Sequence, residues 1–243
     1  MMRLAALYDI HANLPALEDM CQAQVDCIVV GGDIVPRPMP RETLTCLLSL
    51  DIPVQFIRGN CEREMLEQVA GVATGSVSAR YREAVGWVAQ QLLPDYERLL
   101  AGWPLTLQVE IPGLGAVLFC HATPRDDDEI FTRLTPEDRL LPIFERLDVP
   151  LVVCGHTHIQ FDRAIGRIRV VNAGSVGMPF GEPGACWLLL GPDVQFRYTR
   201  YDLTKAAERI RQTNYPLAQI LHPVTSCNPP QRKKCWTYLL SMN

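Results

Sequence analysis

The sequence predicts an α/β fold in which parallel strands end at a common site. Five apolar runs of four or five residues are too short for helices, and each is followed within three residues by a polar residue of a type that binds metals. Helix-like segments separate the first three runs, and this alternation favours parallel strands joined by right-handed crossovers. The five runs span residues 4–8, 27–30, 54–57, 116–120 and 151–154.

The remaining elements are predicted from helical spacing, from proline and glycine breaks, and from turn composition. We expect helices over residues 14–24, 41–50, 78–93, 95–101, 136–147 and 203–213. Residues 105–111 and 116–120 flank a Pro-Gly-Leu-Gly turn and are expected to form a hairpin. Further strands are expected over residues 160–165, 169–171, 185–190 and 195–201.

The length of 243 residues favours one large α/β domain, which we place at residues 1–221. Within it, residues 62–102 lack strand alternation and are interpreted as a helical, lid-like insertion. Residues 222–243 form a C-terminal tail that contains prolines and a short basic run, and no mechanism is assigned to it.

The composition is that of an ordinary globular protein, with 48% hydrophobic and 21% charged residues. A net charge of −4 argues against a protein that binds nucleic acid or an anionic membrane surface. The nine cysteines include no C-x-x-C pair, which argues against a zinc ribbon and favours a reducing compartment. Because no segment approaches the length of a membrane span, we expect a cytoplasmic protein.

Side chains that can bind metals are concentrated directly after the five predicted strands. Four of the five histidines in the chain fall there, a placement that chance does not favour. Because open α/β proteins bind ligands where strand ends converge at the edge of a sheet, we expect these side chains to form one site. The candidate donors are Asp9, His11, Asp33, Asn60, His121, His156 and His158.

Carboxylate, amide and imidazole donors suit divalent Mn, Fe, Ni, Co or Zn better than Ca or Mg. Seven donors are too many for one tetrahedral ion, but they suit two ions if one carboxylate, which we assign to Asp33, is shared. Two ions about 3.5 to 4 Å apart can share a hydroxide and stabilise an in-line displacement at phosphorus. The residues therefore predict a dinuclear phosphoester hydrolase that uses a metal-bridging hydroxide.

In their order and spacing, the motifs resemble those of the calcineurin-like metallophosphoesterases, specifically the small bacterial and archaeal phosphodiesterase branch. They are Asp9-Ile-His11-Ala-Asn13, Gly31-Gly-Asp33, Arg58-Gly-Asn60-Cys61-Glu62, Cys120-His121, Gly155-His156-Thr-His158 and Asn172-Ala-Gly-Ser175. The resemblance implies the metallo-dependent phosphatase fold, a four-layer α/β/β/α sandwich of two mixed sheets flanked by helices. It also implies that one ion binds Asp9, His11, Asp33 and His158, and the other Asp33, Asn60, His121 and His156.

Cys61 stands where many family members carry a histidine that is thought to protonate the leaving group. A thiol with an ordinary pKa of about 8.5 is a poorer general acid than imidazole at neutral pH, so we predict a preference for substrates with good leaving groups. Aryl phosphodiesters, nucleotide-type diesters and phosphoanhydrides meet this condition, whereas alkyl monoesters should react slowly. Two smaller departures are Tyr8, which we interpret as core packing, and Ala12, which is modestly strained if its φ is positive.

The resulting hypothesis is a metal-dependent phosphodiesterase for small molecules, with Asp33, Asn60 and Cys61 as catalytic residues and two ions of Mn, Ni, Fe or Zn. Substrate phosphate contacts are predicted at Asn13, Arg58 and Arg125, which lie beside the donors. Three alternatives stay open: a phosphoprotein or dinucleoside polyphosphate phosphatase, a nuclease, and a non-catalytic metal-binding scaffold, as the similar retromer subunit appears to be. The net charge of −4 argues against the nuclease. The chain could also form a homo-oligomer.

Overall fold

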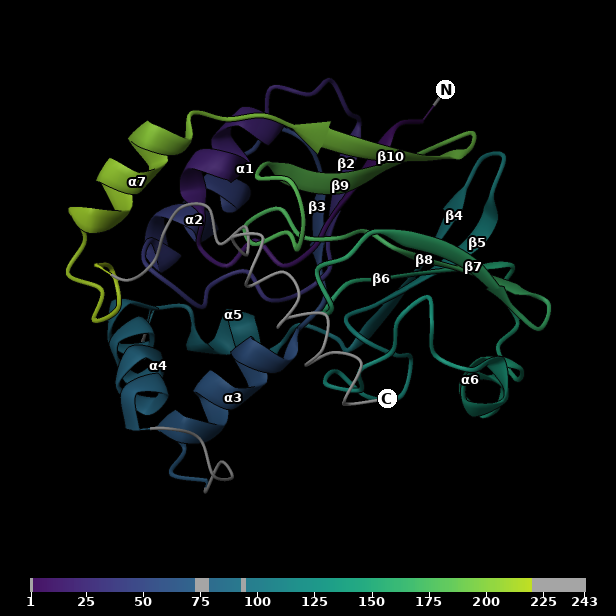
Figure 1. The fold of residues 1–243 in the computed structure, drawn as a ribbon, viewed down its shortest axis with the longest axis horizontal. Coiled ribbons are helices and arrows are strands. Elements are labelled where there is room, and N and C mark those ends of the chain that lie inside the picture. The colour runs from purple at the N-terminus through teal and green to yellow at the C-terminus, as the bar shows by residue number, and fades with distance from the viewer. Residues whose placement is uncertain (1, 73–78, 93–94, 220–243) are drawn as a thin grey trace.

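The computed structural model describes residues 2–72, 79–92 and 95–219, which form two five-stranded mixed sheets and seven helices (Figure 1). The first sheet has the order β10-β9-β1-β2-β3, in which β1, β2 and β3 run parallel. The second has the order β4-β5-β6-β8-β7, with β5, β6 and β8 parallel. The strands of the first sheet are β1 (Leu4–Leu7), β2 (Cys27–Val30), β3 (Val54–Phe56), β9 (Ala185–Leu190) and β10 (Val194–Thr199). Those of the second are β4 (Thr106–Ile111), β5 (Gly115–Cys120), β6 (Leu151–Cys154), β7 (Phe161–Ile165) and β8 (Ile168–Asn172).

The two sheets pack face to face, and helices cover their outer faces. Ala6 of β1 meets Phe119 and Val153 of the second sheet in the core between the sheets. On the other face of β1, Leu7 packs in the core that includes α1 (Leu14–Met20) and α2 (Pro40–Leu48). Phe144 of α6 (Glu137–Phe144) packs on the outer face of the second sheet. The predicted sandwich of two mixed sheets flanked by helices is confirmed.

The strand ends meet where the two sheets adjoin, so the candidate donors come from both sheets and not from the edge of one. The strands β1, β2 and β3 belong to one sheet, whereas β5 and β6 belong to the other. Apolar runs predict strands, but they carry no signal for which strands share a sheet, because pairing depends on contacts far apart in sequence. The site is therefore assembled from both halves of the sandwich.

Residues 60–101 contain three helices, α3 (Asn60–Val69), α4 (Ala79–Leu92) and α5 (Glu97–Ala101), on one side of the molecule (Figure 1). The sequence predicted α4 and α5 but missed α3, a mostly polar segment in which Met65 is the one fully buried apolar side chain among the described residues. The helix that follows β10, α7 (Leu203–Arg211), was predicted, whereas α1 ends at Met20 and is shorter than expected. The predicted tail, residues 222–243, lies outside the described residues.

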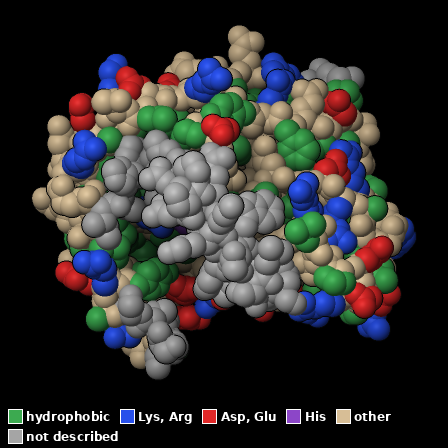
Figure 2. Space-filling view, viewed as in Figure 1, with side chains coloured by type: hydrophobic (Ala, Val, Ile, Leu, Met, Phe, Trp, Pro, Cys, Tyr) green, Lys and Arg blue, Asp and Glu red, His purple; other side chains and the backbone are tan. Residues whose placement is uncertain are grey.

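The charged side chains of the described surface are mixed in sign, and Figure 2 shows acidic and basic groups interspersed over the visible face. In the described part of the chain, no helix combines the length and the apolar character that crossing a membrane requires.

Candidate metal centre

The predicted donors converge from loops at the ends of both sheets. Asp9 follows β1 and Asp33 follows β2, while His121 and His158 come from loops after β5 and β6. His158 Nε2 lies 3.2 Å from Asp9 Oδ1, and His121 Nε2 lies 3.5 Å from Asp33 Oδ1. All four side chains are buried or nearly so, so the convergence forms one shielded polar cluster.

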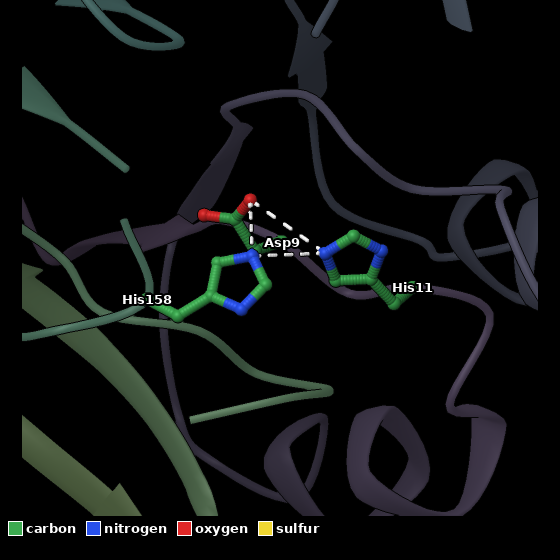
Figure 3. Close-up of side chains that lie close together, drawn as sticks. All are labelled: Asp9, His11 and His158. Carbon is green, nitrogen blue, oxygen red and sulfur yellow. Dashed lines mark hydrogen bonds and ion pairs between the residues drawn. The ribbon is translucent and has the colours of Figure 1, made fainter. Parts of the chain in front are cut away.

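Three overlapping groups of donors have geometry that could hold a metal ion. Asp9, His11 and His158 form the first group, and Figure 3 shows one Asp9 oxygen and one nitrogen of each imidazole turned toward one another. The second group is Asp9, Asp33 and His121, and the third is His11, Asp33 and Cys61. Asp9 and Asp33 each belong to two groups, so either carboxylate is placed to be shared between neighbouring ions.

Backbone carbonyls fix the tautomers of two imidazoles. His121 Nδ1 lies 2.8 Å from the carbonyl oxygen of Gly31, and His158 Nδ1 lies 2.9 Å from that of Met178. A carbonyl oxygen only accepts hydrogen bonds, so each Nδ1 carries a proton. In the neutral rings the Nε2 lone pairs therefore face the cluster, as in histidines that bind metals.

Ligand-type nitrogen and oxygen atoms lie within hydrogen-bond distance of one another inside the cluster. His158 Nε2 lies 3.0 Å from His11 Nε2, and His121 Nε2 lies 3.1 Å from Asn60 Oδ1. The Asn60 amide nitrogen donates to Glu64 Oε1 at 3.3 Å, which leaves its oxygen toward the cluster. Asp9 Oδ1 is buried, and no described residue gives it a hydrogen bond. Cations between such atoms would satisfy them, so the residues present fit divalent metal ions.

The pKa values of three ligand-type groups favour the forms that bind metals. Burial and repulsion from His158 lower the pKa of His11, and burial and His121 lower that of His156 to about 4. Burial alone would raise the pKa of Asp9, but the surrounding imidazoles lower it below its usual range. For His121, burial is outweighed by the nearby carboxylates, which raise its pKa, so a metal would displace a proton more readily from His11 than from His121.

His156 lies beside the cluster without joining any of the three donor groups. Its ring meets that of His121 nearly edge-on, with centroids 5.2 Å apart. Its Nε2 lies 3.6 Å from Oδ1 of Asp128, a residue to which the sequence analysis gave no role. Its assignment as a metal ligand stays a prediction.

The backbone is left-handed at most of the donor positions. The φ angles are 54° at Asp9, 50° at His11, 53° at Asp33, 66° at His156 and 57° at His158. Non-glycine residues rarely adopt this region, and clusters of such residues are typical of functional sites. The neighbouring Ala12 also has a positive φ of 49°, which meets the condition for the strain expected there.

The segment that follows β8 holds the turns that carry the donors. Ser175 Oγ donates to the carbonyl oxygen of Asp9 at 2.7 Å, and Asn172 Nδ2 donates to that of Gly155 at 2.6 Å. The motif that begins at Asn172 therefore supports the site.

Glu62 has the largest structural role that the sequence analysis missed. Its buried carboxylate accepts hydrogen bonds from the backbone N–H groups of Asp33, Ile34, Val35 and Gly59, at 2.7 to 3.2 Å. Burial and repulsion from Asp33 raise the pKa of Glu62 to about 7, while the backbone donors act in the opposite direction. The glutamate at the third position of α3 after Gly59, which is typical of a capping box, is the signal that could have identified it.

Cys61 contacts the carboxylate of Asp33 through both its thiol and its backbone. Sγ donates to Oδ2 at 3.0 Å and the backbone N–H donates to Oδ1 at 3.0 Å. Burial and the charge of Asp33 raise the pKa of the thiol well above its usual range, so it is neutral near pH 7. The residue therefore orients Asp33, and its weak acidity fits the predicted need for good leaving groups.

The three predicted substrate contacts differ in how their polar atoms are used. Asn13 accepts from Ala16 N at the start of α1 and donates to Gly177 and Tyr201, so its amide is occupied. Arg125 forms a two-point ion pair with Glu129 at the surface. Arg58 has a buried Nε that finds no hydrogen-bond partner among the described residues.

Tyr8 lies fully buried under the site, and its hydroxyl donates to the carbonyl oxygen of Val153 at 2.9 Å. We expect Tyr8→Phe to lower the free energy of unfolding by about 1 kcal/mol, the contribution of one buried hydrogen bond. Urea unfolding of the two proteins measures this difference. A catalytic phenol would instead make the variant inactive with unchanged stability.

Comparisons with known proteins point to one family. The family model for a calcineurin-like phosphoesterase superfamily domain matches residues 2–192. Among solved structures, the hypothetical protein PH1004 from Pyrococcus horikoshii OT3 is 20% identical, with a TM-score of 0.78 and coverage of 91% of this chain and 98% of its own. A metallophosphoesterase from Sphaerobacter thermophilus is 24% identical, with a TM-score of 0.69 and coverage of 93% and 100%. A search of curated protein sequences found no match.

Proposed function

Because the chain belongs to the calcineurin-like phosphoesterase superfamily, we propose that it is a metal-dependent phosphodiesterase that hydrolyses small phosphoesters with good leaving groups. The observation that carries the proposal is the convergence of imidazole nitrogens and carboxylates in one buried cluster, with the His11 and His158 Nε2 atoms 3.0 Å apart. Such a cluster is unfavourable without cations and suits divalent ions.

The donor groups suggest how the residues divide the work. Asp9, His11 and His158 would hold one ion, and Asp33, Asn60 and His121 would hold the other. Asp33 would be the carboxylate that the two ions share. Divalent ions bound there would supply Lewis acidity toward phosphoryl oxygens and a lowered pKa for bound water. The chain itself would fix the donors through the carbonyls of Gly31 and Met178, and Arg58 is a candidate contact for a phosphate oxygen.

The direct test measures turnover of metal-free protein to which Mn, Ni, Zn, Fe and Mg are added separately. Aryl phosphodiester, aryl phosphomonoester and dinucleotide substrates separate the proposed activity from its alternatives. We expect metal-dependent turnover that is fastest on the aryl diester. Turnover of none of these substrates with any metal would favour the non-catalytic scaffold of the same fold.

The identity of residue 61 should set the preference for the leaving group. A general acid contributes about 100-fold or more to a rate, so Cys61→His is expected to raise turnover of an alkyl monoester relative to an aryl diester by about 10- to 100-fold. Cys61→Ser keeps a hydroxyl donor for Asp33 without supplying an acid, and it serves as the control. An unchanged ratio of the two rates in Cys61→His would refute the role of residue 61 in this preference.

A further inference from the structure

An apolar chamber of about 110 Å³ opens beside the metal centre. His11 and Cys61 of the donor cluster form part of its lining, and the rest comes from the loop after β2, from α3 and α4, and from the segment after α7. Figure 1 shows α3, α4 and the segment after α7 on the same side of the molecule. A group bound in the chamber would therefore lie next to the reacting phosphorus of a substrate at the metal centre.

The size and chemistry of the chamber match an aromatic ring. Val35, Met65, Ala84 and Val88 present buried apolar side chains to it. An apolar cavity of about 150 Å³ in another protein is known to bind benzene, so a chamber of this size can hold one ring, particularly as it is open on one side. The ring of Tyr215 lies edge-on to Trp87, with centroids 5.3 Å apart, so this aromatic wall is held in place before a ligand binds.

Arg37 supplies the one cationic side chain among the described lining residues. Within the described ranges, its guanidinium has no hydrogen-bond or ion-pair partner, and burial lowers its pKa. Its backbone φ is 128°, a conformation that a non-glycine residue rarely adopts. A partly buried, unpaired guanidinium is costly unless it binds an anion, and its planar donors suit a phosphate group.

We infer that this chamber binds an aromatic ester group of the substrate, while Arg37 binds a non-bridging oxygen of the same phosphate. The inference rests on the proposed phosphoesterase function and names the substrate class of that site. The chemistry favours an aromatic group with few polar edges, since the wall around Val35, Ala84 and Val88 offers no side-chain hydrogen bonds.

Calorimetric binding of phenylphosphonate and methylphosphonate to the Mn-loaded protein tests the inference without turnover. We expect phenylphosphonate to bind about 10- to 100-fold more tightly, the ratio for burial of a ring-sized apolar group. Ala84→Leu and Val85→Phe, which fill the chamber, should remove this preference and leave methylphosphonate affinity unchanged. Circular dichroism checks that each variant folds. If neither variant folds, the ratio of phenylphosphonate to methylphosphonate affinity in the unmodified protein still tests the inference.

Substitution of Arg37 separates the anion contact from the ring contact. Arg37→Met should weaken both phosphonates by a similar factor of about 10, because each loses the same charged hydrogen bond. Arg41→Met is the matched control, since Arg41 pairs with Asp95 and lies outside the chamber lining. Equal affinities of the unmodified protein for the two phosphonates would overturn the inference, as would unchanged binding in Arg37→Met. Selective phenylphosphonate binding by a protein that hydrolyses no substrate would instead overturn only the proposed function.

Discussion

Asp33→Asn is expected to lower metal-dependent phosphodiesterase activity by more than about 100-fold and to reduce the amount of bound metal. Asp33 belongs to two of the three donor groups and is the carboxylate that we propose the two ions share, so the loss of its charge should weaken both ion sites. Changes outside the direct ligands of a metal already cost about 10- to 100-fold, and a shared ligand should cost more.

The variant should fold normally, which makes the loss of activity interpretable. Asp33 Oδ1 accepts from the backbone N–H of Cys61, and an asparagine oxygen can do the same. The new amide nitrogen would then face Cys61 Sγ, which can accept a weak hydrogen bond. The local structure therefore keeps its partners while the negative charge is lost.

Steady-state kinetics on an aryl diester and elemental analysis of dialysed protein measure the two effects. Asp162→Asn is a matched control, because Asp162 forms an exposed ion pair with Arg169 on the second sheet. The control should retain activity and metal content. If Asp33→Asn kept activity within about tenfold of the unmodified protein, a shared-ligand role for this carboxylate would be untenable.

Several strands could be predicted because they are short apolar runs, and β1 and β6 are buried at every position. The run at residues 151–154 became β6 with the predicted bounds, and residues 27–30 became β2. The distribution of these strands over two sheets could not be derived from periodicity, because it depends on long-range pairing. Only the resemblance in motif order implied two facing sheets.

For the site, the sequence predicted which side chains converge, but it did not predict the backbone conformation or the distant contacts that hold them. Residue type and position after strands predicted which side chains converge, because chemistry and strand direction are local properties. The left-handed backbone at Asp9, His11 and Asp33 runs against the preferences of these residues, and contacts from distant segments such as Ser175 hold the first turn. Arg37 carries no sequence signal, because its place in the chamber depends on how α3 and α4 pack.

The start of α3 is held by Glu62, a residue whose loss we expect to destabilise the protein strongly. The N-terminus of the helix lies inside the motif that supplies Asn60, and Glu62 is fully buried beside that terminus. Glu62 joins the start of this helix to the loop after β2, which carries Asp33. One side chain thus fixes the relative position of two donor segments.

Glu62→Ala is expected to lower the free energy of unfolding by about 4 kcal/mol or more. The substitution leaves four backbone N–H groups without their acceptor, and an unsatisfied buried donor costs about 1 to 3 kcal/mol. This loss is a large part of the roughly 5 to 15 kcal/mol that stabilises a typical domain. Glu62→Gln should lie between the two proteins, because its amide oxygen can accept while its nitrogen would face N–H donors.

Urea unfolding of the metal-free proteins measures the effect without a contribution from bound ions. Glu67→Ala, on the same helix, removes a surface pair with Arg63 and should cost less than about 1 kcal/mol. Any Glu62→Ala protein that remains folded should also bind metal more weakly, because the Asp33 loop is no longer fixed to α3. Equal unfolding midpoints for Glu62→Ala and Glu67→Ala would show that water replaces the carboxylate, and that Glu62 does not position Asp33.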